Sequence, residues 1–296
     1  FQFLNVFSIF SMKKLMLICA PVSSQSGYGA HARDLVRSFM EHDKYDVRII
    51  DVRWGDCPRN ALKFNNPDDR KMIDCILPEP PQIERQPDIY VDIRIPNEFA
   101  QHGKFNIGIT AGVETTAVSN AWLDGCNKMD LVIVPSEHSK AGFVNSVWDK
   151  VQDMPDGKQQ KIGEIRLEKP IEVLFEGADD TIYKPLKDDE ISLDKIDEIV
   201  SEDFNFLMVG QWGNGGFGED RKDIGRTIKL FYETFANLEN QPGLILKTHG
   251  STFSILDRES CLSKINDVKN MFPREWNLPN VYLLHGEFTN EEMNQL

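Results

Sequence analysis

The sequence predicts an α/β protein with two successive domains, each built on a parallel sheet. Apolar runs of strand length alternate with helix-length segments along most of the 296 residues, and this alternation is typical of parallel sheets covered by helices. A chain of this length also favours two domains over one. The pattern pauses in an acidic stretch and then restarts for only three strands. We therefore expect one domain over 12–185, an acidic linker over 186–203 and a second, incomplete domain over 204–296.

The first domain is predicted from strand segments that are short, apolar and rich in branched residues. We expect these strands at 14–20, 45–52, 88–95, 105–113, 131–136 and 171–177. Apolar residues recur with helical spacing between them, and the expected helices occupy 30–42, 68–76, 119–129 and 137–148. Strands joined through helices in this way lie parallel. Residues 149–169 are polar and are expected to form a surface insertion.

The second domain opens with a strand, a glycine-rich loop and a helix between Phe204 and Phe235. This order places backbone N–H groups and a helix N-terminus where a phosphate can bind. Further strands are expected at 243–249 and 280–286, with a helix near 255–271 between them. Near the end of the chain, Thr289 and Glu292 have the spacing of a capping box, which predicts the start of another helix.

The composition limits the partners that the protein can have. The chain is 41% hydrophobic and 27% charged, which is ordinary for a globular protein. Its formal net charge of −14 disfavours wholesale binding to nucleic acid or to an anionic membrane. The five cysteines are scattered and form no CxxC pair, which favours free thiols in a reducing cytosol. We expect a cytoplasmic protein without a transmembrane segment, and peripheral attachment to a membrane stays open.

Both ends of the chain suggest a fragment of a longer sequence. Residues 1–11 are apolar, and the positive charges follow this run, whereas a signal peptide carries them before it. We interpret 1–11 as an extension upstream of Met12, with a short segment that packs on the domain as the alternative. The last expected helix stops after about two turns, and we therefore expect a C-terminal truncation.

The first glycine-rich segment runs from Gly27 to Ala32 and fits the G-x-G-x-x-A dinucleotide pattern. Asp51 ends the next strand, about where a ribose-binding acid would lie. However, six residues separate the preceding strand from Gly27, whereas the dinucleotide turn follows its strand almost at once. Three interpretations of this segment stay open. We favour a loop that faces a ligand. The second is a purely structural turn, and the third is the fingerprint of a nicotinamide-dependent oxidoreductase, formed by Gly27, Gly29, Ala32 and Asp51.

The second glycine-rich segment, 213–218, has the glycine spacing of a P-loop, but Glu219 and Asp220 stand where Lys and Ser or Thr are required. We favour a hairpin without a ligand for 211–220. Arg221 and Lys222 are different, because cations are unfavourable at a helix N-terminus unless an anion binds there. This pair therefore predicts an anion site.

Six segments in this order carry a resemblance to a known family. They are 26–39, 112–143, 173–186, 206–235, 244–250 and 280–296. The chain resembles the family-4 retaining glycosyltransferases (glycosyl transferases group 1), and the resemblance covers nearly all of it from Met12 onward. It implies the GT-B architecture, in which two Rossmann-like domains face each other, with the second domain incomplete in this chain.

The resemblance implies transfer of a sugar from a nucleotide-sugar donor to a glycan, lipid or protein acceptor, with retention of configuration. Lys222 would hold the donor diphosphate, and Arg221 would assist it. Gly27 and Gly29 would approach the diphosphate with their backbone, and Gly210 would end the strand beneath it.

The resemblance also identifies what differs here. Glu114 is the candidate catalytic residue of the first domain, and a carboxylate that caps the next helix is the alternative. Gln211 stands where relatives usually have a second phosphate-binding arginine. The family's two donor-binding glutamates do not occur within the chain, so we expect this fragment to be inactive or nearly so.

No metal or other cofactor is expected. The six histidines lack metal-ligand spacing, and the chain offers no DxD motif for metal-dependent transfer. A nicotinamide-dependent oxidoreductase and a non-catalytic protein with a glycosyltransferase-like fold stay open as alternative functions.

Overall fold

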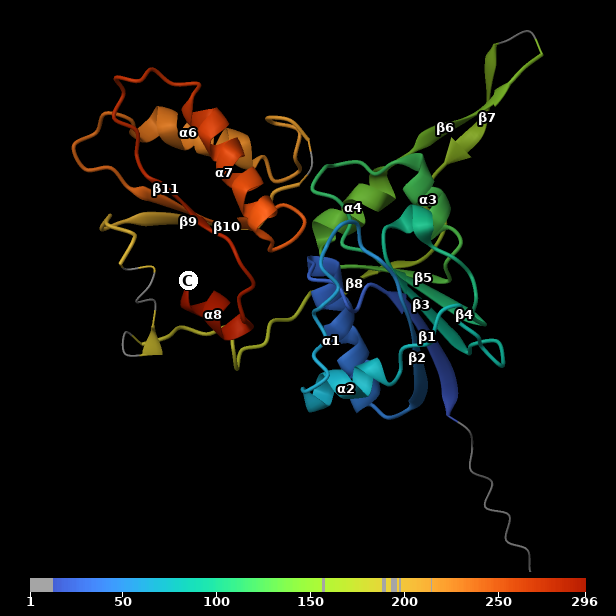
Figure 1. Ribbon diagram of the computed structural model, residues 1–296. Coiled ribbons are helices and arrows are strands. Elements are labelled where there is room, and N and C mark those ends of the chain that lie inside the picture. Colours follow the sequence, from blue (N-terminus) through green and yellow to red (C-terminus); the bar gives the residue numbers. More distant parts are fainter. Residues whose placement is uncertain (1–12, 156–157, 188–189, 193–195, 197, 214) are drawn as a thin grey trace, which may run out of the picture. The chain divides into compact units, whose positions relative to one another are not determined.

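The computed structural model describes residues 13–155, 158–187, 190–192, 196, 198–213 and 215–296. The chain forms two compact units, Phe1–Glu176 and Gly177–Leu296. Each unit has a parallel sheet with helices packed on it (Figure 1), which confirms the α/β class expected from the sequence. The expected extension 1–11 and part of the expected linker 186–203 lie outside the described residues.

The first unit is built on a six-stranded parallel sheet with the order β2-β1-β3-β4-β5-β8. Its strands are β1 (Lys14–Ala20), β2 (Tyr45–Asp51), β3 (Ile89–Ile93), β4 (Phe105–Ile109), β5 (Leu131–Val134) and β8 (Ile171–Val173). Its helices are α1 (Gly27–Glu41), α2 (Pro67–Ile73), α3 (Asn120–Cys126) and α4 (Glu137–Asn145), with a 3-10 turn at Pro96–Glu98. Each strand lies within its expected range. The strand order reverses at β1, and ligands of such sheets bind at the carboxyl edge near this point.

Helices cover both faces of this sheet, which explains why its strands are apolar almost throughout. Ala32 and Val36 of α1 pack on one face together with Met72 of α2. Leu123 of α3 and Phe143 of α4 belong to a second cluster with alternate residues of β5. The first unit is therefore a doubly wound α/β domain of the Rossmann-like kind.

One buried ion pair lies within this apolar sheet. Asp92 of β3 is fully buried, and its Oδ1 and Oδ2 accept hydrogen bonds from Arg94 Nε at 2.6 Å and Arg94 Nη2 at 2.8 Å. The hydroxyl of Tyr90 and the backbone N–H of Ala100 also donate to Asp92 Oδ2, each at 3.1 Å. The carboxylate therefore has a charged partner and a full set of donors, and it anchors the segment after β3 to the sheet.

The polar segment expected as a surface insertion is a regular two-stranded ribbon. β6 (Trp148–Asp153) and β7 (Gln159–Ile165) pair antiparallel and project from the rest of the unit (Figure 1). Trp148 Nε1 donates to the carbonyl of Val118 at 2.8 Å and anchors the base of the ribbon. The sequence Pro-Asp-Gly at 155–157 is typical of turns, but the hairpin was not predicted from it, and residues 156–157 lie outside the described part of the chain.

Two buried thiols predict a loss of stability in alkali. Burial raises the pKa of the Cys19 thiol from 9.0 to about 11 and that of Cys126 to about 12. In the unfolded chain these thiols lose their protons near pH 9.0. Above that pH the native state therefore binds more protons than the unfolded state. We expect the free energy of unfolding to fall as pH rises from 9.0 to about 11, by about 1.4 kcal/mol per pH unit for each thiol.

Urea unfolding over this pH range measures the effect, with Cys126→Ala as the matched variant. The variant should show a shallower decline than the wild type, because its unfolded state has one fewer thiol that ionises. Parallel declines in the two proteins would contradict the role of Cys126.

The second unit has a three-stranded parallel sheet of order β11-β10-β9 within the described residues. Its elements are β9 (Asn205–Gln211), α6 (Ile224–Phe235), β10 (Gly243–His249), α7 (Ile255–Lys269), β11 (Val281–Leu284) and α8 (Asn290–Gln295). Helices α6 and α7 lie on one face of the sheet (Figure 1) and share its apolar core. The predicted capping box at Thr289 and Glu292 is confirmed.

The edge strand β9 shows that this sheet is only partly covered. Leu207 and Val209 point to the same face of β9, and they remain 44% and 50% exposed. Strands of a parallel sheet are normally buried on both faces. The face of β9 that carries Leu207 and Val209 is therefore left partly uncovered by the described residues, and the predicted incompleteness of the second domain stays a prediction. No helix among these residues is long and apolar enough to cross a bilayer.

Candidate functional site

The structure places the predicted site residues at or just beyond the carboxyl edges of the two sheets, in two separate groups. Gly27, Gly29 and Glu114 belong to the first unit, and Gly210, Arg221 and Lys222 belong to the second. Carboxyl edges of parallel sheets are where α/β proteins bind their ligands.

Helix α1 begins at Gly27, and the expected start near residue 30 is wrong by one turn. The cause is the N-cap residue Ser26, whose side chain accepts a hydrogen bond from Gly29 N at 3.0 Å. The hydroxyls of Ser24 and Ser26 lie 2.6 Å apart and hold the end of the preceding loop. Gly27 and Gly29 are therefore in the first helical turn, and the extended glycine loop that we expected does not form there.

The two glycines have different surroundings. A Cβ atom on Gly29 would lie 2.4 Å from the carbonyl oxygen of Ser24 and 2.9 Å from that of Pro21, so the fold itself requires glycine at this position. A Cβ atom on Gly27 would have no atom within 4 Å, and Gly27 is exposed. Only Gly27 therefore presents bare backbone to an approaching ligand.

Alanine substitutions should separate these two roles. Gly29→Ala should lower the free energy of unfolding by about 1–3 kcal/mol, because the new methyl group overpacks against the Ser24 carbonyl. Gly27→Ala should change it by less than about 0.5 kcal/mol, because the methyl group points into open space. Urea titration of the two variants measures both values, and equal losses would contradict the assigned roles.

Tyr28 ties the start of α1 to the end of β4. Its hydroxyl lies 2.9 Å from Thr110 Oγ1 and accepts a hydrogen bond from Ala111 N at 3.0 Å. The Tyr28 ring stacks on Trp54, with the ring centroids 4.1 Å apart. Burial raises the pKa of Tyr28, so the phenol stays neutral and can donate as well as accept. The first helical turn and the turn after β4 are therefore held in one fixed arrangement.

The turn that carries Glu114 has a well-supported backbone. Ser139 Oγ donates to the carbonyl of Ala111 at 3.2 Å, and His138 Nε2 lies 3.3 Å from the carbonyl oxygen of Glu114. Glu114 itself is exposed. It is not the N-cap of the next helix, because that position belongs to Ser119. The proposed catalytic role of Glu114 stays a prediction.

In the second unit, the structure brings Gly210 and Lys222 together. The Cγ, Cδ and Cε atoms of Lys222 would each lie 3.7 Å from a Cβ atom on Gly210, so the lysine stem packs over the end of β9. The backbone N–H of Lys222 donates to Asp220 Oδ1 at 3.1 Å, which fixes the chain at this point. Lys222 is exposed, and no carboxylate of the described residues forms an ion pair with its ammonium group. Arg221 precedes it on the same loop and is also exposed.

Helix α6 starts with a strained N-cap. Asp223 has the left-handed backbone angles φ 51° and ψ 41°, and its side chain makes no capping hydrogen bond. Asp223 Oδ1 is buried and has no hydrogen-bond partner among the described residues, while Oδ2 lies 3.4 Å from Arg226 Nε. A non-glycine residue in this conformation costs free energy and often marks a functional position. The N-terminus of α6, which directly follows Lys222 and Asp223 in the sequence, therefore lacks a side-chain cap.

The glycine-rich segment before these cations forms turns, in agreement with its turn composition, but it forms no strands among its described residues. Gly216 N donates to Glu219 Oε2 at 2.6 Å, so a carboxylate of the chain occupies a backbone amide that a phosphate would need. Gly215 and Gly218 have positive φ values of 124° and 77°. Glycine adopts such backbone angles without strain, so the turn conformation accounts for glycine at these two positions. This segment is not a phosphate cradle.

Gln211 has a structural partner. Its Nε2 donates to the carbonyl of Gly250 at 2.7 Å, and Trp212 N donates to the carbonyl of His249 at 2.8 Å. The end of β9 is thereby linked to the loop after β10. The side chain that replaces the expected arginine therefore holds two loops of this edge together.

Sequence reasoning missed a cluster around Asp257, a residue of α7. Asp257 Oδ1 accepts from Ser251 N at 2.9 Å, and Oδ2 accepts from Gly250 N at 2.9 Å. His285 Nε2 lies 2.8 Å from the same Oδ2. Burial alone would raise the pKa of Asp257, but the hydrogen bonds from His285, Ser251 and Gly250 outweigh it and lower the pKa. Asp257 thus joins the loop after β10 to the end of β11.

Lys247 and His249 complete this cluster at the end of β10. Lys247 is 7% exposed, and its Nζ donates to the carbonyl of Gly286 at 2.6 Å and lies 4.3 Å from the ring centre of Phe288. Burial lowers the pKa of Lys247, and burial together with the nearby Lys247 charge lowers that of His249. The signal was present in the sequence, because Lys247 and His249 lie at the carboxyl end of β10 and His285 directly follows β11.

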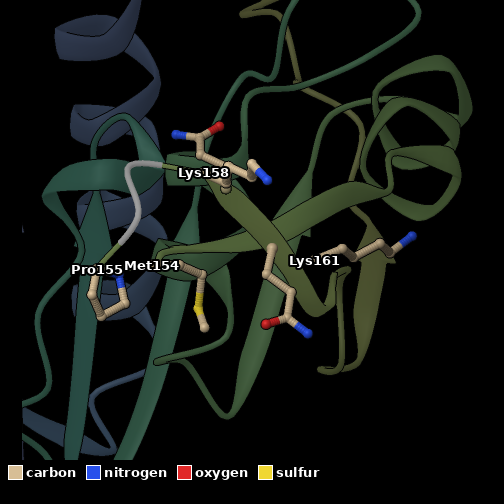
Figure 2. A pocket seen from close by; sticks show the side chains of 6 residues that line it. Met154, Pro155, Lys158 and Lys161 are labelled. Atoms are coloured by element: carbon tan, nitrogen blue, oxygen red, sulfur yellow. The ribbon is translucent and has the colours of Figure 1, made fainter.

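The surface also has a hollow of about 550 Å³ on the β6–β7 ribbon, lined by Met154, Pro155, Lys158, Gln159, Gln160 and Lys161. These side chains come from the segment between the two strands and from the start of β7, and Figure 2 shows that they do not converge on one point. None of the predicted site residues lines it. No group of three or more metal-ligating side chains comes together within the described residues.

Comparison with solved structures finds chains described as "OtsA apo structure" and "Trehalose-6-phosphate synthase. OtsA". The first is 11% identical, covers 95% of this chain and 75% of its own, and has a TM-score of 0.45. The second is 12% identical with the same coverage and a TM-score of 0.47. No protein-family model matches the sequence, and the comparison with curated proteins gave no match. Similarity of this extent assigns no function to the chain.

Proposed function

We propose that the chain is a glycosyltransferase of the GT-B type, related to the family-4 retaining enzymes, that uses a nucleotide-sugar donor. The observation that carries the proposal is the position of Lys222. Its stem packs over Gly210 at the carboxyl end of β9, the residue is exposed, and it lies two residues before the start of α6, whose N-cap makes no side-chain hydrogen bond. The order of the six sequence segments supports the same proposal.

The chemistry proposed for this site is stabilisation of the leaving group. When the bond between the sugar and the diphosphate breaks, negative charge develops on the departing phosphate oxygen. Lys222, assisted by Arg221, would stabilise this charge more in the transition state than in the ground state, which is what accelerates a reaction. We propose that this step needs no metal and retains the sugar configuration, with Glu114 on the acceptor side.

The structure weakens the support for an oxidoreductase. Asp51, the residue expected to bind a ribose, already uses both carboxylate oxygens within the protein. Oδ1 accepts from Ser23 N at 3.1 Å, and Oδ2 pairs with Arg59 Nη2 at 2.7 Å, with the side chain only 7% exposed. A ribose would have to displace one of these partners. A non-catalytic protein with the same fold remains the second candidate, and the presence or absence of the paired glutamates in the sequence that follows Leu296 would decide between the two.

A thermal-shift series tests donor binding against cofactor binding. We expect UDP, GDP or ADP to raise the midpoint of unfolding, because a ligand that binds only the folded state stabilises it. NADH should have no comparable effect. Stabilisation by NADH and by none of the three diphosphates would overturn the proposal in favour of an oxidoreductase.

A further inference from the structure

Residues 215–220, here called the glycine-rich turn, fold back onto the first turn of helix α6. A Cβ atom on Gly225 would lie 3.1 Å from Phe217 Cδ2, so the Phe217 ring lies directly against the helix at this buried glycine. A Cβ atom on Gly218 would lie 2.8 Å from Arg226 Nη2, the next residue of the helix. The glycine-rich turn therefore contacts two successive residues of α6.

The glycine-rich turn is also closed by its own hydrogen bonds. Gly216 N donates to Glu219 Oε2 at 2.6 Å, and Glu219 N donates to the carbonyl of Gly216 at 3.1 Å. A Cβ atom on Gly215 would lie 2.9 Å from Glu219 Cβ, so the turn is too compact at this point for a larger residue. This segment is therefore a defined turn that packs on the helix, although it cradles no phosphate.

Asp220 ends the glycine-rich turn and is only 6% exposed. Aspartate is rarely buried to this extent unless its carboxylate has a partner. Asp220 Oδ1 accepts from Lys222 N at 3.1 Å, and the carbonyl of Asp220 accepts from Asp223 N at 2.9 Å. Hydrogen bonds to an ionised acceptor are stronger than those between neutral groups. Asp220 thus holds the backbone at Lys222 and at the residue that follows it.

We propose that the glycine-rich turn sets the position of Lys222 for the donor diphosphate, with Asp220 and Phe217 as positioning residues. This inference rests on the proposed function, which assigns Lys222 to the diphosphate. Asp220 holds the backbone of Lys222, and Gly210 lies beneath its stem, so the lysine is held at two points. A cation that is already in position stabilises developing charge without reorganisation. The glycine-rich turn therefore acts on the phosphate through Lys222.

The test is calorimetric titration of residues 1–296 with UDP, GDP and ADP, each compared with its monophosphate. Asp220→Ala should lower the preference for the diphosphate at least about fivefold, because Lys222 loses its backbone anchor. Asp220→Asn keeps an acceptor for Lys222 N and should stay within about twofold of the wild type. Phe217→Ala frees the turn from α6 and should lower the preference at least about threefold.

Two further variants separate positioning from other effects. Asp220→Ala added to Lys222→Ala should cause no further loss of preference, because the effect of Asp220 passes through the lysine. Glu219→Gln removes a charge from the same turn but keeps an acceptor for Gly216 N, and it should leave the preference within about twofold of the wild type. A merely structural role of Asp220 would lower the midpoint of unfolding and leave the preference unchanged.

Unchanged preference in Asp220→Ala and Phe217→Ala would overturn the inference, as would an equal loss from Asp220→Ala with and without Lys222. An equal loss in Asp220→Asn would overturn it too, because charge rather than the hydrogen bond would then be the cause. Phe217 is 46% exposed, so Phe217→Ala decides the matter if Asp220→Ala does not fold. Equal affinity of the wild type for both ligands refutes the proposed function, and the inference with it.

Discussion

Replacing Lys222 with alanine should lower sugar transfer from a nucleotide-sugar donor at least about tenfold, if the proposed function holds. Loss of one cation that stabilises a departing diphosphate costs on the order of ~3 kcal/mol in barrier height. The fold should be unaffected, because Lys222 is exposed and packs only its stem over Gly210. The rate is measured in a form of the protein that carries the paired glutamates, since residues 1–296 lack them.

A second lysine, on the helix that follows Lys222, provides the matched control. Lys229 of α6 carries the same charge but forms an ion pair with Glu233, one turn further along. Lys229→Ala should leave the transfer rate within about twofold of the wild type, because a surface pair of this kind contributes less than about 1 kcal/mol to stability. An unchanged rate in Lys222→Ala would remove Lys222 from the site, whereas equal losses in both variants would indicate a general charge effect.

Arg94→Ala should produce the largest loss of stability. The substitution leaves the fully buried carboxylate of Asp92 without its charged partner, with only Tyr90 and Ala100 as donors. Breaking a buried ion pair in this way costs about 3–5 kcal/mol. Urea unfolding of the variant and the wild type measures the difference.

The double variant Asp92→Asn with Arg94→Gln tests whether the unpaired buried charge of Asp92 causes the loss of stability in Arg94→Ala. It removes both charges but keeps an acceptor for Tyr90 and Ala100, so it should be more stable than Arg94→Ala. A single variant that loses less than about 1 kcal/mol would contradict this explanation, as would a double variant less stable than the single one.

Most of the fold could be predicted because its signals are local. Apolar runs identified every strand of the two parallel sheets, and the capping box at Thr289 identified a helix start. The start of α1 was misplaced because Ser26 was considered part of a loop, although Ser followed by a helix is a capping signal. The β6–β7 ribbon was missed because its polar composition concealed a turn sequence at 155–157.

The candidate site was less predictable because its contacts join distant parts of the chain. The sequence indicated Lys222 from a charge at a helix start, but the packing of its stem over Gly210 needs the folded loop. Asp257 lies within a helix, and nothing in its sequence neighbours indicates His285 as a partner. The different roles of Gly27 and Gly29 likewise depend on where the carbonyl of Ser24 lies.

The most direct test of the central claim is calorimetric titration of residues 1–296 with a nucleoside diphosphate and the matching monophosphate. UDP with UMP is one such pair, and GDP with GMP is another. If Lys222 holds the diphosphate, the wild type binds the diphosphate more tightly, and Lys222→Ala reduces this preference about tenfold, or about 1.4 kcal/mol. Equal affinity for both ligands in the wild type, or an undiminished preference in Lys222→Ala, would contradict the assignment of this edge of the second sheet as a donor site.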